Sequence, residues 1–156
     1  MTALSRRGCC MDKAPVEDIV DTLADALREI RQDNGYSTDL GAAVNTEWSE
    51  NSAKALRCTV VAREKSRTEG GQNRPATGRF VRGVIAIEVP VTMEHSQQMI
   101  YRAEQDVDRC LSKYFQMPQA LPVIYEESIF MEQPEGAPVR VAEIVWSTGY
   151  RRREDD

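Results

Sequence analysis

Few residues in this sequence have the types and spacing that catalysis requires. The single histidine, His95, follows Glu94 at the expected start of a helix, where a polar residue needs no catalytic role. General acid–base work by histidine also requires a partner that orients the ring, and none is evident. The adjacent Cys9 and Cys10 lack the spacing of a zinc-ligand pair, and no histidine lies near them. Together with Cys58 and Cys110 they are expected to be reduced thiols.

Motifs that bind phosphate or activate a nucleophile are also missing. Gly70-Gly71 is not followed by the Lys-Ser/Thr pair of a phosphate-binding loop, and no GxSxG sequence occurs. The acidic pairs Glu126-Glu127 and Asp155-Asp156 are interpreted as solvated charge, because adjacent side chains on a strand point to opposite faces. The sequence therefore predicts a protein that is not an enzyme, with no catalytic residue, cofactor or metal. A small enzyme or ligand-binding domain, with its site between helices and sheet, is the alternative from another class.

The positive charges have a more suggestive distribution. Basic residues gather in and beside one long polar segment, at Arg63, Lys65, Arg67, Arg74, Arg79 and Arg82, and again at residues 151–153. Solubility, contact with a partner's acidic face and contact with DNA are all compatible with such a pattern. The formal net charge of −5 argues against a general nucleic-acid binder, which usually carries a basic footprint.

Length and composition indicate the kind of domain that positions these charges. A length of 156 residues, with 41% hydrophobic residues, suits one globular domain with a real core. Residues 1–13 have no periodicity and are expected to form a flexible arm, residues 14–152 the domain, and residues 153–156 a charged tail. No apolar stretch is long enough to span a bilayer and no secretory signal is present, so we expect an intracellular protein.

Hydrophobic periodicity predicts two amphipathic helices. The first runs from Pro15 to about Gln32 and is stopped by Asn34-Gly35. The second runs from His95 to Phe115. The apolar stripe of the first helix consists of Val16, Ile19, Val20, Leu23, Leu27 and Ile30.

Alternation of apolar and polar residues predicts four strands, at 55–63, 80–91, 123–131 and 139–150. The first two form an antiparallel hairpin with an extended tip at 64–79, and Gly83 marks a bulge or a close approach. Val44 and Trp48 are expected to anchor the intervening turn-rich segment 36–52. The predicted fold class is α+β: two amphipathic helices packed on a mainly antiparallel four-stranded sheet, in the order α-β-β-α-β-β.

One segment carries a resemblance to a known family. The sequence Asn34-Gly35-Tyr36-Ser37-Thr38-Asp39-Leu40-Gly41, followed by Val44, resembles the tail-terminator and tail-completion proteins of long-tailed bacteriophages. In those proteins a helix runs into the pattern NGY-x-T-D-[IL]-G-x-x-V. The stretch AEQDVDRCL at 103–111 is similar to the family's second helix, and the stretch VWSTGYR at 145–151 to its closing strand. In element order the likeness covers most of residues 15–152.

The resemblance implies a structural protein that caps the tail tube, stops its growth and provides the surface that joins tail to head. Its partners would be copies of itself in a ring, a homohexamer, together with the tail tube protein and the head–tail connector protein. Neither a membrane nor a specific DNA sequence would be bound. The protein would act in the host cytoplasm during assembly and then at the head-proximal end of the tail in the virion. A head-completion, connector or minor tail subunit is the near alternative. The candidate contact residues for subunits and partners are Arg63, Arg67, Arg74, Arg79, Arg151 and Arg152.

Overall fold

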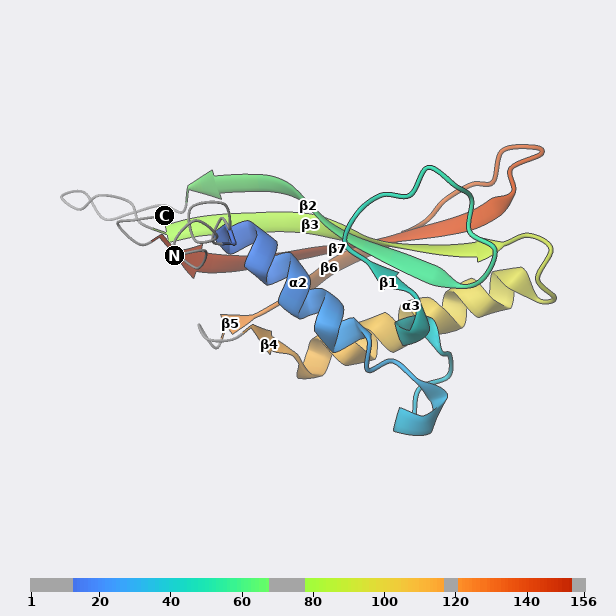
Figure 1. Cartoon of the computed structure of the whole chain (residues 1–156), viewed down its shortest axis with the longest axis horizontal. Helices are drawn as coiled ribbons and strands as arrows, with labels where there is room; N and C mark the ends of the chain where they lie inside the picture. Colours follow the sequence, from blue (N-terminus) through green and yellow to red (C-terminus); the bar gives the residue numbers. More distant parts are fainter. Residues whose placement is uncertain (1–12, 68–77, 117–120, 153–156) are drawn as a thin grey trace, which may run out of the picture.

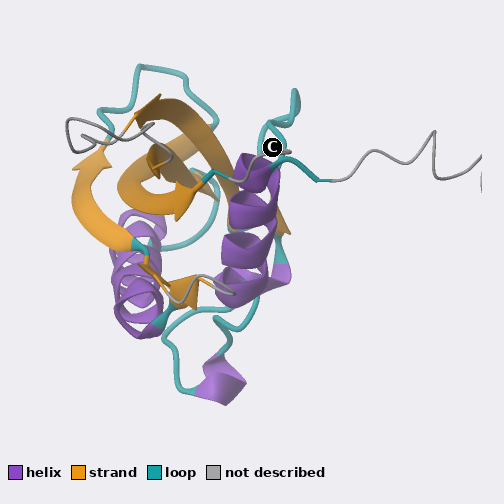
Figure 2. Cartoon of the chain, turned by 90° about the vertical axis from the view of Figure 1, so that its left-hand side faces the viewer, coloured by secondary structure: helices purple, strands orange, loops and turns teal. Residues whose placement is uncertain are grey.

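The computed structural model describes residues 13–67, 78–116 and 121–152. Two helices, α2 (Pro15–Leu27) and α3 (Ser96–Lys113), lie on the same face of one sheet (Figures 1 and 2). The other face of that sheet carries neither helix. The protein is thus a two-layer mixed α+β domain, as the sequence predicted at the level of fold class.

The main sheet has five strands in the order β1-β2-β3-β7-β6 (Figure 1). The strands are β1 (Val44–Asn45), β2 (Arg57–Arg67), β3 (Gly78–Pro90), β6 (Ile124–Phe130) and β7 (Val139–Arg151). A separate antiparallel pair joins β4 (Phe115–Gln116) to β5 (Leu121–Pro122).

The predicted four-stranded, mainly antiparallel sheet is therefore wrong in detail. The four long strands occur in the expected chain order and pair antiparallel, but β1 adds a fifth strand that runs parallel to β2. Strands of two residues, such as β1, β4 and β5, contain no repeat that alternation could reveal.

Helix α2 ends five residues earlier than the periodicity predicted. The last i→i−4 bond of the helix runs from the Arg28 N–H to the Ala24 carbonyl at 3.0 Å, and the N–H of Ile30 donates to the Leu27 carbonyl in a tighter turn at 3.0 Å. A 3₁₀ turn, η1 (Gln32–Asn34), follows, and Gly35 caps that turn with a φ of 87°. The predicted stop at Asn34-Gly35 therefore ends the 3₁₀ turn η1 and not helix α2. Ile30 lies beyond the end of the helix, but its side chain is buried and belongs to the core.

Helix α3 is preceded by His95, which adopts a left-handed φ of 56°. The helix ends at Lys113, so the expected extension to Phe115 is wrong: Phe115 begins β4. The apolar side chains of this helix that are buried in the core are Ile100, Ala103, Val107, Cys110 and Leu111.

The core lies between the helices and the sheet. Along β3 the side chains of Val81, Ile85, Ile87 and Val89 share the helix-facing side and are buried, as their common parity predicted. Gly83 lies on that same side, opposite Trp146 on β7. A Cβ at Gly83 would collide with the Val61 carbonyl oxygen and lie 2.5 Å from Trp146 Cζ2, so the predicted close approach is confirmed.

Two further expectations concern the segments between these elements. Val44 is buried as predicted, but Trp48 is 55% exposed and anchors nothing in the core. The expected loop 64–79 is shorter than predicted, because β2 continues to Arg67 and β3 begins at Gly78. The charged residues at 64–67 favour a loop in the sequence, but a strand at the edge of a sheet also tolerates charged side chains. The centre of that loop at 68–77, residues 1–12 of the arm and the tail at 153–156 lie outside the described residues.

Candidate functional site

The ends of three adjacent strands bring arginines together at one end of the sheet. Arg67 on β2 is paired directly with Arg79 on β3, and Arg151 on β7 is paired with Gly78. Neighbouring strands lie about 4.8 Å apart, so these three residues occupy one small area. Arg152 follows at once and is exposed. Four of the six predicted contact residues therefore lie at this end of the sheet. The side chains of Arg79 and Arg151 are on opposite faces, because Arg79 is paired with Tyr150 and Arg151 with Gly78.

Further contacts fix the positions of these positive charges. The Arg79 Nη1 atom donates to the Gly78 carbonyl at 2.9 Å. Lys65 Nζ lies 5.8 Å from the centroid of the Tyr150 ring, in a cation–π contact. Like charges directly opposite one another on adjacent strands are destabilising, as for Arg67 and Arg79.

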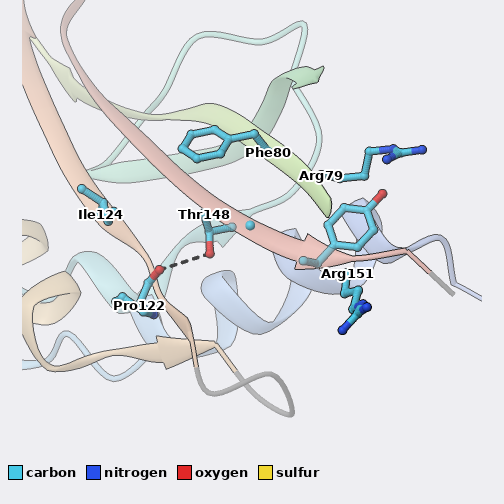
Figure 3. A pocket seen from close by; sticks show the side chains of 8 residues that line it. Arg79, Phe80, Pro122, Ile124, Thr148 and Arg151 are labelled. Carbon is cyan, nitrogen blue, oxygen red and sulfur yellow. Dashed lines mark hydrogen bonds between the residues drawn. The ribbon is translucent and has the colours of Figure 1, made fainter. Parts of the chain in front are cut away.

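An apolar hollow of about 470 Å³ lies beside the arginines. Figure 3 shows Phe80 and Ile124 on one side and Arg79 and Arg151 toward the end of the strands. Phe80 is 43% exposed and Ile124 51% exposed. The Thr148 Oγ1 atom donates to the Pro122 carbonyl at 3.2 Å and so holds the segment before β6 against β7. An exposed apolar surface of this kind, bordered by charge, is typical of a protein contact.

Sequence reasoning missed the hollow. Phe80 and Ile124 are 44 positions apart, and each lies in a predicted strand. No local pattern in the sequence indicates that β7 brings these two strands together. The available signal was a large apolar residue on the solvent parity of its strand: Phe80 alternates with the buried Val81.

Two of the predicted contact residues are not part of this group as described. Arg63 lies at the bulge of β2 and its Nη2 atom is 3.4 Å from Glu143 Oε1 on the helix-free face. Arg74 lies outside the described residues. On the same face Arg82 pairs with Glu126 at 2.7 Å, and Arg57 pairs with Glu88 at 3.1 Å.

The residues that could have performed chemistry are separated or buried. His95 is exposed, and its nearest ionic neighbour is Glu94 at 3.3 Å. Burial raises the pKa of the Cys58 thiol to about 12 and also raises the pKa of the Cys110 thiol. Among the described residues, no group of three or more His, Cys, Asp or Glu side chains is placed to hold a metal ion.

The segment that carries the family resemblance is held by one buried carboxylate. Asp106 of α3 is fully buried. Its Oδ2 atom accepts from the Thr38 N–H at 2.8 Å and from the Thr38 hydroxyl at 2.7 Å, and its Oδ1 atom accepts from the Ser37 N–H at 3.1 Å. We call this set of bonds the Asp106 clasp. It joins the segment at 34–44 to the stretch at 103–111, so two parts of the sequence resemblance form one structural unit.

Two other contacts complete the same unit. The Arg109 guanidinium lies over the Tyr36 ring, 4.8 Å from its centroid, and donates to the Gly35 carbonyl at 3.1 Å. The Gly41 N–H donates to the Ile30 carbonyl at 2.8 Å. A Cβ at Gly41 would collide with the Arg28 carbonyl, so only glycine allows this approach. The motif thus stabilises the fold.

No protein-family model matches the chain, and no curated protein matches it. Neither α2 nor α3 has the length and hydropathy of a membrane-spanning helix, and these are the α-helices of the described residues.

Proposed function

We propose that this protein is a structural assembly subunit of the tail-terminator type, which forms a ring at the end of a phage tail tube. The observation that carries the proposal is the apolar hollow bordered by Arg79 and Arg151. Protein interfaces have an apolar centre, and arginine is more frequent in them than on the rest of the protein surface. The resemblance at residues 34–44 and 103–111 supports the choice of family.

The mechanism is geometric. One face of the ring binds the last ring of the tube, and the opposite face differs from the tube end, so growth stops and a docking surface for the connector is left. A ring also requires a contact between two different patches on neighbouring copies, with a rotation that closes. The two ends of strand β3 differ in the charged residues that lie near them. Arginines lie where β3 begins at Gly78, and the turn at 91–95, which holds Glu94, lies where β3 ends.

Oligomeric state tests the proposal. Native mass spectrometry of the full chain is expected to show a closed ring. Phe80→Asp places a charge in the hollow and is expected to reduce ring formation, whereas Trp48→Asp changes another exposed aromatic elsewhere and leaves the ring intact. A wild-type chain that stays a single subunit at every concentration, with or without tube protein, would contradict the proposal.

The same hollow supports a second candidate, a small-molecule site. Ligand pockets typically measure about 300–1,000 Å³ and are mainly apolar, and the hollow falls in that range. A thermal-shift screen separates the two candidates. A rise of several degrees with one apolar anion, abolished in Phe80→Asp and kept in Trp48→Asp, would favour ligand binding.

A further inference from the structure

The turn between β6 and β7 has the opposite character to the hollow. Residues 131–138 form this turn, which we call the acidic turn. Glu132 and Glu135 are exposed, no basic residue lies in it, and Met131 is 47% exposed. An acidic segment with a large flexible apolar side chain complements an apolar hollow bordered by arginines.

Internal hydrogen bonds hold the acidic turn in one shape. The Ala137 N–H donates to the Pro134 carbonyl at 3.0 Å, and the Gln133 Nε2 atom donates to the Ala137 carbonyl at 2.8 Å. At its base the Met131 N–H donates to the Val141 carbonyl at 3.0 Å. A loop that is ordered before binding loses less conformational entropy on docking.

A copy cannot place the acidic turn in its own hollow. Strand β7 connects the two, from Val139 beside the turn to Arg151 at the hollow, and it has 13 residues. At about 3.3 Å per residue β7 spans about 40 Å, and β6, which joins Ile124 at the hollow to Phe130 beside the turn, spans about 20 Å. In Figure 1 the turn between β6 and β7 lies at the end of the sheet that is far from the chain termini.

We propose that the acidic turn of one copy docks in the hollow of the next copy. Met131 enters the hollow against Phe80 and Ile124, and Glu132 and Glu135 face Arg79 and Arg151. The contact joins two different patches, so each copy uses its turn on one side and its hollow on the other, and the series closes into a ring when the rotation permits. This inference rests on the proposed function and names the contact that builds the ring.

Charge reversal in the full chain tests the contact. The hollow-reversed variant carries Arg79→Glu and Arg151→Glu, and the turn-reversed variant carries Glu132→Arg and Glu135→Arg. Each variant alone brings like charges together and is expected to weaken assembly about tenfold or more. The matched controls, Arg31→Glu and Glu50→Arg, reverse exposed charges elsewhere and leave assembly unchanged.

An equal mixture of the two variants gives the decisive result. Each acidic hollow then meets a basic turn, and each basic hollow meets an acidic turn. Native mass spectrometry is expected to show restored oligomers with equal numbers of the two variants. Circular dichroism verifies that each variant is folded. Where Arg79→Glu disturbs the fold, Arg151→Glu alone replaces it in the mixture.

The outcomes separate this inference from the proposed function. A wild-type ring that neither reversal weakens, or weakened variants that the mixture does not restore, would overturn the turn-to-hollow contact while the ring stands. A wild-type chain that never assembles would overturn both.

Discussion

Replacing Asp106 with asparagine tests whether one buried carboxylate holds the segment that carries the family resemblance. Asp106 accepts three hydrogen bonds, two from Thr38 and one from the Ser37 N–H. Asparagine keeps one acceptor oxygen, which can retain both bonds from Thr38. Its NH₂ group then faces the Ser37 N–H, so two donors meet and the amide of Ser37 loses its partner.

The size of the effect follows from these contacts. Hydrogen bonds to charged groups contribute about 1.5–3 kcal/mol each, and an unsatisfied buried donor costs about 1–3 kcal/mol. Asp106→Asn is therefore expected to lower the free energy of unfolding by about 3 kcal/mol. Asp106→Ala loses all three bonds and is expected to cost about 4–5 kcal/mol, near the upper end for single substitutions. Both are large against a total of about 5–15 kcal/mol for a typical domain.

Urea unfolding followed by far-UV circular dichroism measures the difference. Asp108→Asn is the matched control, because Asp108 lies on the same helix and is only partly buried. A double-mutant cycle of Asp106→Asn with Thr38→Val isolates the pairwise coupling, since Thr38→Val removes only the hydroxyl bond to the carboxylate. If Asp106→Asn and Asp108→Asn lowered the free energy of unfolding by equal amounts, the clasp would not stabilise the fold as argued.

Two further predictions concern the core. Gly83→Ala forces a Cβ onto the Val61 carbonyl and is expected to cost about 3 kcal/mol, whereas Gly149→Ala, whose Cβ lies 3.3 Å from its nearest neighbour, costs less; equal urea midpoints for the two variants would contradict this. Burial raises the pKa of Cys58 from its ordinary value of 9.0 to about 12, so the unfolded chain loses this proton first as the pH rises. The free energy of unfolding should therefore fall between pH 9 and about 12, and less steeply in Cys58→Ala; identical slopes in parallel urea titrations would refute the assignment.

The two helices and four long strands could be predicted because their signals are local. Buried residues recur every three or four positions in α2 and α3, and the β3 side chains that join the core cluster share one parity. The prediction was wrong at the helix ends and at Trp48. A carbonyl such as that of Ile30 can be satisfied by the distant Gly41 N–H instead of by the next helical turn, and this choice depends on how the chain folds back.

The Asp106 clasp is a second feature that the sequence did not predict. The sequence contains both of its halves, at 34–44 and at 103–111, but gives no sign that one carboxylate joins them. The two bonded residues, Thr38 and Asp106, are 68 positions apart. Their pairing requires α3 to lie beside the turn after α2, which the packing of both helices on one face of the sheet determines.

By itself the sequence determined the element types, the parity of the core and the concentration of arginine, because each depends on residues close together in the chain. Only the tertiary structure decided that Arg79 and Arg151 border an apolar hollow and that Arg67 lies beside Arg79. The pairing register of β2, β3 and β7 sets those positions. Register depends on how whole strands bury their apolar faces, a property of the complete sheet that no single segment contains.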